Sequence, residues 1–196
     1  MNKFQIKTVA IASAMLLVGS AAFAAGDHEG PMTELANSKI KAWVSDPAVV
    51  SAVNAQNAKH ASLSQGEIDA LDKKWRAETK AGSKPMIDGV LGTALSGFLR
   101  KIRDDSKGLY TEIFVMDNKG LNVGQSDVTS DYWQGDEAKF KKTYPAGPAG
   151  LDIGEVEEDE STQRFQSQLS MTVVDPATKK AIGAVTIGVD IENLGQ

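Results

Sequence analysis

The chain has 196 residues, two histidines, no cysteine and a formal net charge of −5 at pH 7. The lack of cysteine excludes thiol catalysis, iron–sulfur clusters and thiolate zinc sites, and two histidines are too few for a multi-histidine metal site, so we expect no metal or other cofactor. The acidic balance also argues against nucleic acid and anionic membrane surfaces as partners.

Residues 1–24 have the pattern of a secretory signal. Lys3 and Lys7 form a positive head, residues 10–22 are apolar, and Ala22-Phe23-Ala24 supplies the small residues that signal peptidase requires. A membrane anchor is the alternative reading, but the apolar run is shorter than the ~20 residues of a spanning helix. We therefore expect a cleaved signal and a periplasmic mature protein. Because the signal carries two lysines and no acid, the net charge of the mature chain falls to −7.

Up to about residue 105 the apolar residues recur at helical spacing. We predict a helix over 31–44 and another from Pro47 to about residue 60, either separate or as one long helix kinked at Pro47. The run Ser64-Gln65-Gly66-Glu67 is a capping box that opens a third helix. Lys84-Pro85 starts a fourth helix, which we expect to continue to about residue 104.

After residue 105 the pattern is that of strands separated by turns. We predict a hairpin from 109–117 and 121–125, a short helix near 137–141, and strands over 161–174 and 181–191. The last strand is apolar almost throughout, which is typical of a central position. Consecutive hairpins imply an antiparallel sheet, so the fold class is α+β with about five strands.

The run from Glu155 to Glu160 has five acids in six residues. It lacks the alternation of oxygen ligands and the glycine that a calcium loop requires. We expect a solvated, mobile loop, with a docking surface for a basic partner as the alternative.

Four stretches together resemble the extracytoplasmic PAS-like sensor domains called Cache or PDC domains. They are Ala42–Val50 with Gln56–His60, Ile113–Gly120, Ser126–Glu137, and the terminal strand pair with Asp175-Pro176 followed by Gly183–Ile191. The resemblance implies a single domain over 31–196 after a disordered start at 25–30. It also implies a PAS-like sheet with a long N-terminal helix and further helices packed on it.

The resemblance also implies that the chain is a non-catalytic sensor, which binds a small molecule and passes ligand occupancy to a membrane receptor or kinase. A second copy of the chain is a further candidate partner. The pocket is expected between the sheet and the segment that joins its second and third strands, here 131–144. Amino-acid-binding relatives usually place an arginine two positions before the pocket tryptophan, but Asp131 stands there in this chain.

Aromatic and acidic residues concentrate in the same segment. Aromatic walls and carboxylates suit an amine or an amino-acid-like ligand, through cation–π contact and ion pairing. Arg164 is a candidate substitute for the missing clamp. The candidate ligand-binding residues are Asp131, Tyr132, Trp133, Asp136, Tyr144, Arg164 and Gln166.

Structural roles remain open for several of these residues. Tyr132 and Trp133 also suit the roof of a core, Asp131 suits a helix cap, and Arg164 suits a solvated strand. Two other functions remain as alternatives to the sensor. One is an adaptor that acts only through protein contacts, and the other is a hydrolase that uses Asp131 and Asp136.

Overall fold

The computed structural model describes residues 28–159 and 164–194. The expected signal peptide therefore lies outside the described residues. Within the described ranges, no helix combines the length and apolar character needed to cross a membrane.

The N-terminal helical stretch begins at Glu29, two residues before the expected start. It comprises α1 (Glu29–Leu35), a π-helical turn η1 (Ala36–Ile40) and α2 (Lys41–Val44). The His28 ring lies just ahead of it and contacts the Gly154 carbonyl at 3.0 Å through Nε2.

Asp46 separates this stretch from α3 (Pro47–Lys59). Its backbone is extended and its carboxylate accepts a hydrogen bond from the N–H of Ala48 at 2.8 Å, so α3 has a true N-cap. Of the two alternatives for this region, separate helices rather than one kinked helix form.

The capping box at Ser64 is confirmed, with both of its reciprocal hydrogen bonds at the start of α4 (Gln65–Glu78). The single helix expected over 84–104 is wrong, because it divides into α5 (Pro85–Leu91) and α6 (Ala94–Asp105). Thr93 has an extended backbone between them, and its hydroxyl accepts from the Ser96 N–H at 3.2 Å. A side-chain cap therefore starts a new helix where the apolar periodicity continues without a break.

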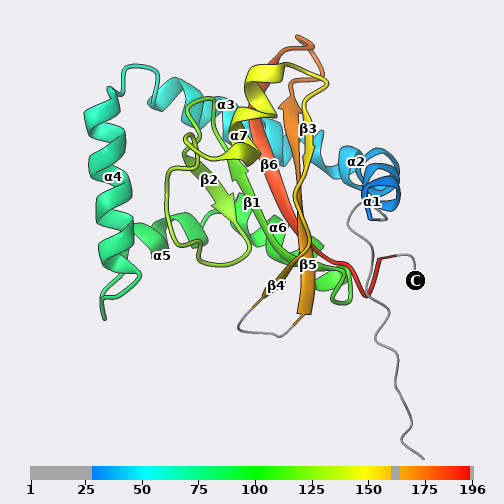
Figure 1. The fold of residues 1–196 in the computed structure, drawn as a ribbon. Helices are drawn as coiled ribbons and strands as arrows, with labels where there is room; N and C mark the ends of the chain where they lie inside the picture. Colours follow the sequence, from blue (N-terminus) through cyan, green and yellow to red (C-terminus); the bar gives the residue numbers. More distant parts are fainter. Residues whose placement is uncertain (1–27, 160–163, 195–196) are drawn as a thin grey trace, which may run out of the picture.

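One antiparallel sheet forms the second half of the chain (Figure 1). Its order is β2-β1-β6-β5-β3. Strand β4 also pairs with β5, at residues nearer the start of β5 than those that pair with β3. The strands and short helices are β1 (Tyr110–Met116), β2 (Asn122–Gln125), α7 (Ala138–Lys141), η2 (Tyr144–Ala146), β3 (Leu151–Ile153), β4 (Glu157–Asp159), β5 (Arg164–Val174) and β6 (Ala181–Asp190). The central position of the last strand is confirmed, since β6 lies between β1 and β5.

The expected loop in the acidic run is wrong for its middle part. Residues 157–159 form β4 and pair antiparallel with residues 164–166 of β5. A charged strand at the margin of a sheet discourages pairing with another chain, which explains how an acidic sequence occupies this position.

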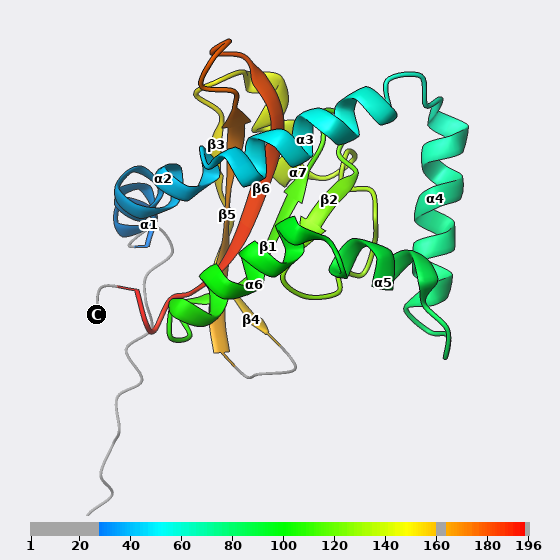
Figure 2. The same cartoon turned by 180° about the vertical axis from the view of Figure 1, so that it is seen from behind.

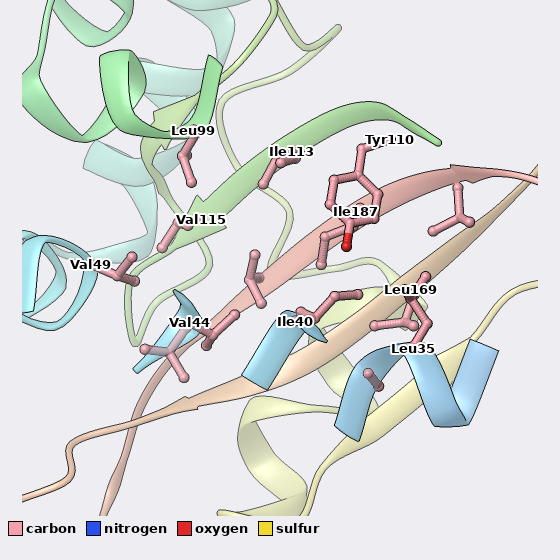
Figure 3. Close-up of a cluster of buried hydrophobic side chains, with 14 of the residues drawn as sticks. Leu35, Ile40, Val44, Val49, Leu99, Tyr110, Ile113, Val115, Leu169 and Ile187 are labelled. Atoms are coloured by element: carbon pink, nitrogen blue, oxygen red, sulfur yellow. The ribbon is translucent and has the colours of Figure 1, made fainter. Parts of the chain in front are cut away.

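Helices cover one side of the sheet, which we call the helix side (Figure 2). The main core lies there, where side chains from α1 to α3 and α6 meet the inward residues of β1, β5 and β6. In Figure 3, Ile40, Val49 and Leu99 from the helices converge on Val115 and Ile187 from the strands. Burial of these apolar side chains is the main favourable term that holds the two layers together.

A second, smaller core lies beside β2. It joins Ile68 and Trp75 of α4, Ile87 of α5, Leu121 and Tyr132. Figure 1 shows α4 and α5 at the β2 margin of the sheet, away from the main helical layer. The architecture confirms the predicted α+β class with an antiparallel PAS-like sheet.

Candidate functional site

The side of the sheet opposite the helices, here the loop side, carries the β2–α7 loop (residues 126–137), α7 and η2 (Figure 1). Strand residues alternate between the two sides. Those that face the loop side of β1, β5 and β6 are mostly polar. They include Glu112, Gln166, Gln168, Ser170, Thr186 and Asp190.

Two hydrogen bonds cross the central strand on this side. The Thr111 hydroxyl donates to the Gln166 side-chain oxygen at 2.8 Å, and the Gln168 amide donates to the Glu112 carboxylate at 2.9 Å. Both bonds link β1 to β5 above Gly188 of β6, which pairs with Glu112 and Gln168. A Cβ on Gly188 would lie 2.1 Å from Thr111 Oγ1 and 3.0 Å from Glu112 Cγ. Glycine is therefore required for this close approach.

Further polar pairs extend the row along the strands. The hydroxyls of Ser170 and Thr186 lie 2.9 Å apart, and both residues are buried. Asp190 is buried at the end of β6 and accepts from the Arg164 guanidinium at 3.0 Å. Buried hydroxyls and carboxylates are retained in a protein only where they are hydrogen-bonded, so this part of the loop side is a structured polar surface.

Aromatic rings cover the other end of the loop side. The rings of Phe140 and Tyr144 stack at 5.5 Å between centroids, and they pack with Phe114 and Met116 of β1. The Lys139 ammonium lies 5.3 Å from the centre of the Phe114 ring. A sheet floor of polar groups with an aromatic wall and one cation is a surface that can recognise a small polar organic molecule.

The predicted residues Asp131, Tyr132 and Trp133 lie in the β2–α7 loop, where they bind α4. The Asp72 carboxylate accepts hydrogen bonds from the backbone N–H groups of Tyr132 and Trp133, at 2.8 and 3.0 Å. Arg76 donates to the Asp131 carboxylate at 3.0 Å. The chain thus uses these residues to fasten the loop.

The two aromatic side chains of this loop are engaged as well. Tyr132 is buried and stacks on Trp75 at 5.3 Å between ring centroids. The Trp133 indole donates to the Lys119 carbonyl at 2.8 Å and lies against Gly135, where a Cβ would come 2.3 Å from the indole nitrogen. Asp136 is exposed.

The predicted residues therefore fall into separate places. Gln166 contacts Thr111 near the start of β1, whereas Asn122, beneath the loop that carries Asp131, pairs with Met116 at the end of β1. Five residue steps along β1 separate those positions, or about 17 Å. Tyr144 lies with the aromatic wall between them.

Burial and charge shift two proton equilibria near the loop. Burial raises the pKa of the Tyr132 phenol far above its usual range, and the negative charge of Asp117 adds to the rise. The hydrogen bond to Asp72 raises the pKa of Arg76, and the charges of Asp72, Asp131 and Asp136 add to it. The Arg76 cation is therefore permanent.

Sequence reasoning missed Glu112, Thr186 and Lys139. The partners of Glu112 and Thr186 on neighbouring strands were not readable from the sequence, and Lys139 lies in α7 rather than in a strand. His60 at the end of α3 is buried, with Nδ1 2.9 Å from the Asp117 carboxylate, which also accepts from Gln56 at 3.0 Å.

Within the described ranges, no group of three or more histidine or acidic side chains is arranged to hold a metal ion. No protein-family model matches the chain, and no curated protein matches it either.

Several solved sensor domains align with most of this chain at low sequence identity. The sensor domain of the histidine kinase DctB from V. cholerae aligns with 85% of this chain at a TM-score of 0.44 and 9% identity. The sensor domain of DcuS from E. coli aligns with 85% at 0.46 and 12% identity. The ligand-binding domain of the Campylobacter jejuni chemoreceptor Tlp3, in complex with 4-methylisoleucine, aligns with 85% at 0.39 and 12% identity.

The chain is similar to these sensor domains over most of its length. The chain spans 56% of the DctB domain and 61% of the Tlp3 domain, but 96% of the DcuS domain.

Proposed function

We propose that this chain is a non-catalytic sensor domain that binds a small organic molecule on the loop side of its sheet. The observation that carries the proposal is the pair of hydrogen bonds above Gly188, from Thr111 to Gln166 and from Gln168 to Glu112. A face that was simply solvated would leave its polar groups to water, whereas these side chains bond to one another and the neighbouring Ser170, Thr186 and Asp190 are buried. Here three strands present an ordered set of donors and acceptors toward the loops.

The charges on this side favour an amine or an amino-acid-like ligand. The Glu112 carboxylate suits an ammonium group, and the aromatic wall of Phe140 and Tyr144 adds cation–π attraction. Lys139, which lies over Phe114 and pairs with Glu137 at 2.9 Å, suits a carboxylate. Arg164 is held by Asp190, so a carboxylate would have to share it.

Among the predicted site residues, we assign Tyr144, Arg164 and Gln166 to the ligand and give Asp131, Tyr132 and Trp133 the task of holding the loop on α4. Asp136 is exposed, and its negative charge stabilises the Arg76 cation. The ion pair of Asp131 with Arg76 also weakens the hydrolase alternative, since a carboxylate that fastens the loop to α4 is not free to approach a substrate.

The cellular setting belongs to the proposal as well. We propose that the signal at 1–24 is cleaved, that one domain follows it, and that the mature protein works in the periplasm. The disordered start expected over 25–30 is wrong for Glu29 and Gly30, which lie in α1. A ligand-dependent contact with a membrane receptor or kinase would pass on the signal. A second copy of the chain is a further proposed partner.

A thermal-shift screen of amines, amino acids and organic acids tests binding, because a ligand that binds only the folded state raises its melting temperature. We expect one class to raise the melting temperature of the mature chain. Gln168→Met should abolish the shift, and the matched control Gln65→Met, on the exposed face of α4, should retain it. A shift that survives Gln168→Met would place the ligand elsewhere, and no shift with any class would contradict the sensor role.

A further inference from the structure

A groove lies where the first helical stretch meets the β3 margin of the sheet (Figure 1 and Figure 2). Its volume is about 230 Å³. An apolar cavity of about 150 Å³ already accommodates benzene, so this groove is large enough for a short hydrocarbon chain. We call it the margin groove, and its lining includes Asn37, Lys41, Val44, Leu151, Met171 and Val174.

The floor of the margin groove is apolar. Leu151 of β3 and Met171 of β5 are directly paired, so their side chains lie on the same side of the sheet. Met171 packs against the main core, which identifies that side as the helix side. Leu151 is 37% exposed, so a ligand that covers it gains apolar burial. The margin groove is therefore separate from the candidate site, which lies on the loop side.

The rim of the groove carries one charged side chain, Lys41. No acidic residue of the described part of the chain lines the groove. Three acids directly follow lining residues in the sequence, and each has another partner. Asp46 caps α3, and Asp175 accepts from backbone N–H groups of its own turn. Asp152 pairs with Lys142 at 2.9 Å. Lys41 therefore gives the groove a positive rim, although the chain as a whole is acidic.

The open margin of β3 adds a backbone donor. The Gly150 carbonyl accepts from the Thr172 N–H at 3.0 Å. The Gly154 N–H donates to the Gln168 carbonyl at 2.8 Å. Since bonded and non-bonded pairs alternate in an antiparallel ladder, residue 151 directs its N–H and C=O away from β5. The Leu151 N–H therefore faces the open margin of the sheet, where this residue also lines the groove.

The helical wall of the groove contains a π-helical turn. η1 supplies Ala36 and Asn37 to the lining, and Lys41 follows η1 directly. Turns of this kind are rare and are found frequently at functional sites. The π-helical turn is thus a second indication, independent of the charge and the volume, that this groove has a function.

We propose that the margin groove binds a small monocarboxylate with a short apolar chain. Its carboxylate accepts a charge-assisted hydrogen bond from the Lys41 ammonium and a hydrogen bond from the Leu151 N–H. Its hydrocarbon chain covers Val44, Met171 and the exposed side chain of Leu151. An ammonium of the same chain length is repelled by Lys41, and an uncharged alcohol gains the apolar burial without the ion pair.

NMR titration of the isotope-labelled mature chain with hexanoate tests the proposal. We expect saturable shifts of the backbone amide resonances of Lys41 and Leu151. Hexylamine and hexan-1-ol, which have the same chain length, should bind about tenfold more weakly or less, because they lack the charge-assisted hydrogen bond. The absence of a saturable shift with hexanoate, or an equal affinity for hexylamine, would overturn the proposal.

Two variants locate the binding site. Lys41→Gln removes the cation from an exposed position and should weaken hexanoate binding about tenfold. Its matched control, Lys39→Gln, removes an exposed cation that does not line the groove and should leave the affinity unchanged. Ala149→Phe, at an exposed position of the lining, should fill the groove and abolish binding. Equal effects of the two lysine variants, or full binding by Ala149→Phe, would overturn the proposal.

The outcome is distinguishable from that of the sensor proposal. Gln168→Met changes the loop side of the sheet and should bind hexanoate as the wild type does. A loss of hexanoate binding in Gln168→Met would place this ligand above Gly188 and would overturn the assignment to the margin groove.

Discussion

Arg76 of α4 donates to the Asp131 carboxylate of the β2–α7 loop at 3.0 Å, across 55 residues of sequence. Arg76 is half exposed, whereas the Asp131 side chain is almost buried. The pair therefore fastens a loop beside the sheet to a helix that lies away from the main core.

Replacement of Arg76 tests this fastening. We expect Arg76→Gln to lower the free energy of unfolding by about 1 kcal/mol, because partly exposed ion pairs contribute modestly. Lys73→Gln removes a cation from the exposed face of the same helix and should change it by less than about 0.5 kcal/mol. Urea denaturation measures both, and equal effects would show that only the net charge matters.

Trp75 contributes more to the same attachment. It is fully buried, its indole donates to the Thr129 carbonyl at 2.9 Å, and its ring stacks on Tyr132. We expect Trp75→Phe to cost about 2–3 kcal/mol, since it loses a buried hydrogen bond and leaves space. Trp43→Phe, at a half-buried position on α2, should cost less. A neutral Trp75→Phe in the same denaturation experiment would argue against the attachment.

Substitution by alanine at Gly188 and at Gly97 should change the free energy of unfolding in opposite directions. Gly188→Ala forces a Cβ against Thr111 and Glu112, so we expect a loss of about 1–3 kcal/mol. Gly97 lies inside α6, where a Cβ would meet only Arg100, at 3.9 Å. Gly97→Ala should stabilise the chain by about 0.5–1 kcal/mol. Calorimetric melting separates the two, and a harmless Gly188→Ala would contradict the crowding above β6.

The raised pKa of the Tyr132 phenol predicts that the folded chain loses stability at high pH. Its pKa is raised by burial in the folded chain, whereas an unfolded phenol titrates near pH 10. Above about pH 10 the unfolded chain binds fewer protons than the folded one, so stability falls as pH rises, by about 1.4 kcal/mol per unit for this group. Below about pH 10 the stabilisation that the protonated Tyr132 phenol provides is fully present.

Tyr132→Phe should flatten this dependence in denaturation curves between pH 9 and 11. Tyr110 also has a pKa raised by burial and should account for part of the remaining slope. An unchanged slope in Tyr132→Phe would show that the phenol is accessible in the folded chain.

Local patterns in the sequence were sufficient for most of the secondary structure. The capping box at Ser64 and the strand pattern in 161–174 are short-range signals, and both are confirmed within the described residues. The division at Thr93 was missed because apolar spacing continues across it. Strand β4 was missed because its acidic sequence has low strand propensity, and only pairing with β5 makes it a strand.

The candidate site was harder to predict, because its contacts join distant residues. Glu112 and Gln168 are 56 positions apart, and only the register of β1, β5 and β6 brings them together above Gly188. Composition pointed to the aromatic and acidic segment at 131–144. The partners of that segment on α4, Asp72 and Arg76, carried no signal that distinguished them from other charged residues on a helix.

Native mass spectrometry of the mature chain in a pool of amines, amino acids and organic acids tests the central claim most directly. The account predicts a one-to-one complex with a molecule of defined mass for the wild type. Gln168→Met should weaken it at least tenfold, and Gln65→Met should not. A wild-type chain that forms no such complex, or a complex equally strong in Gln168→Met, would contradict binding above Gly188.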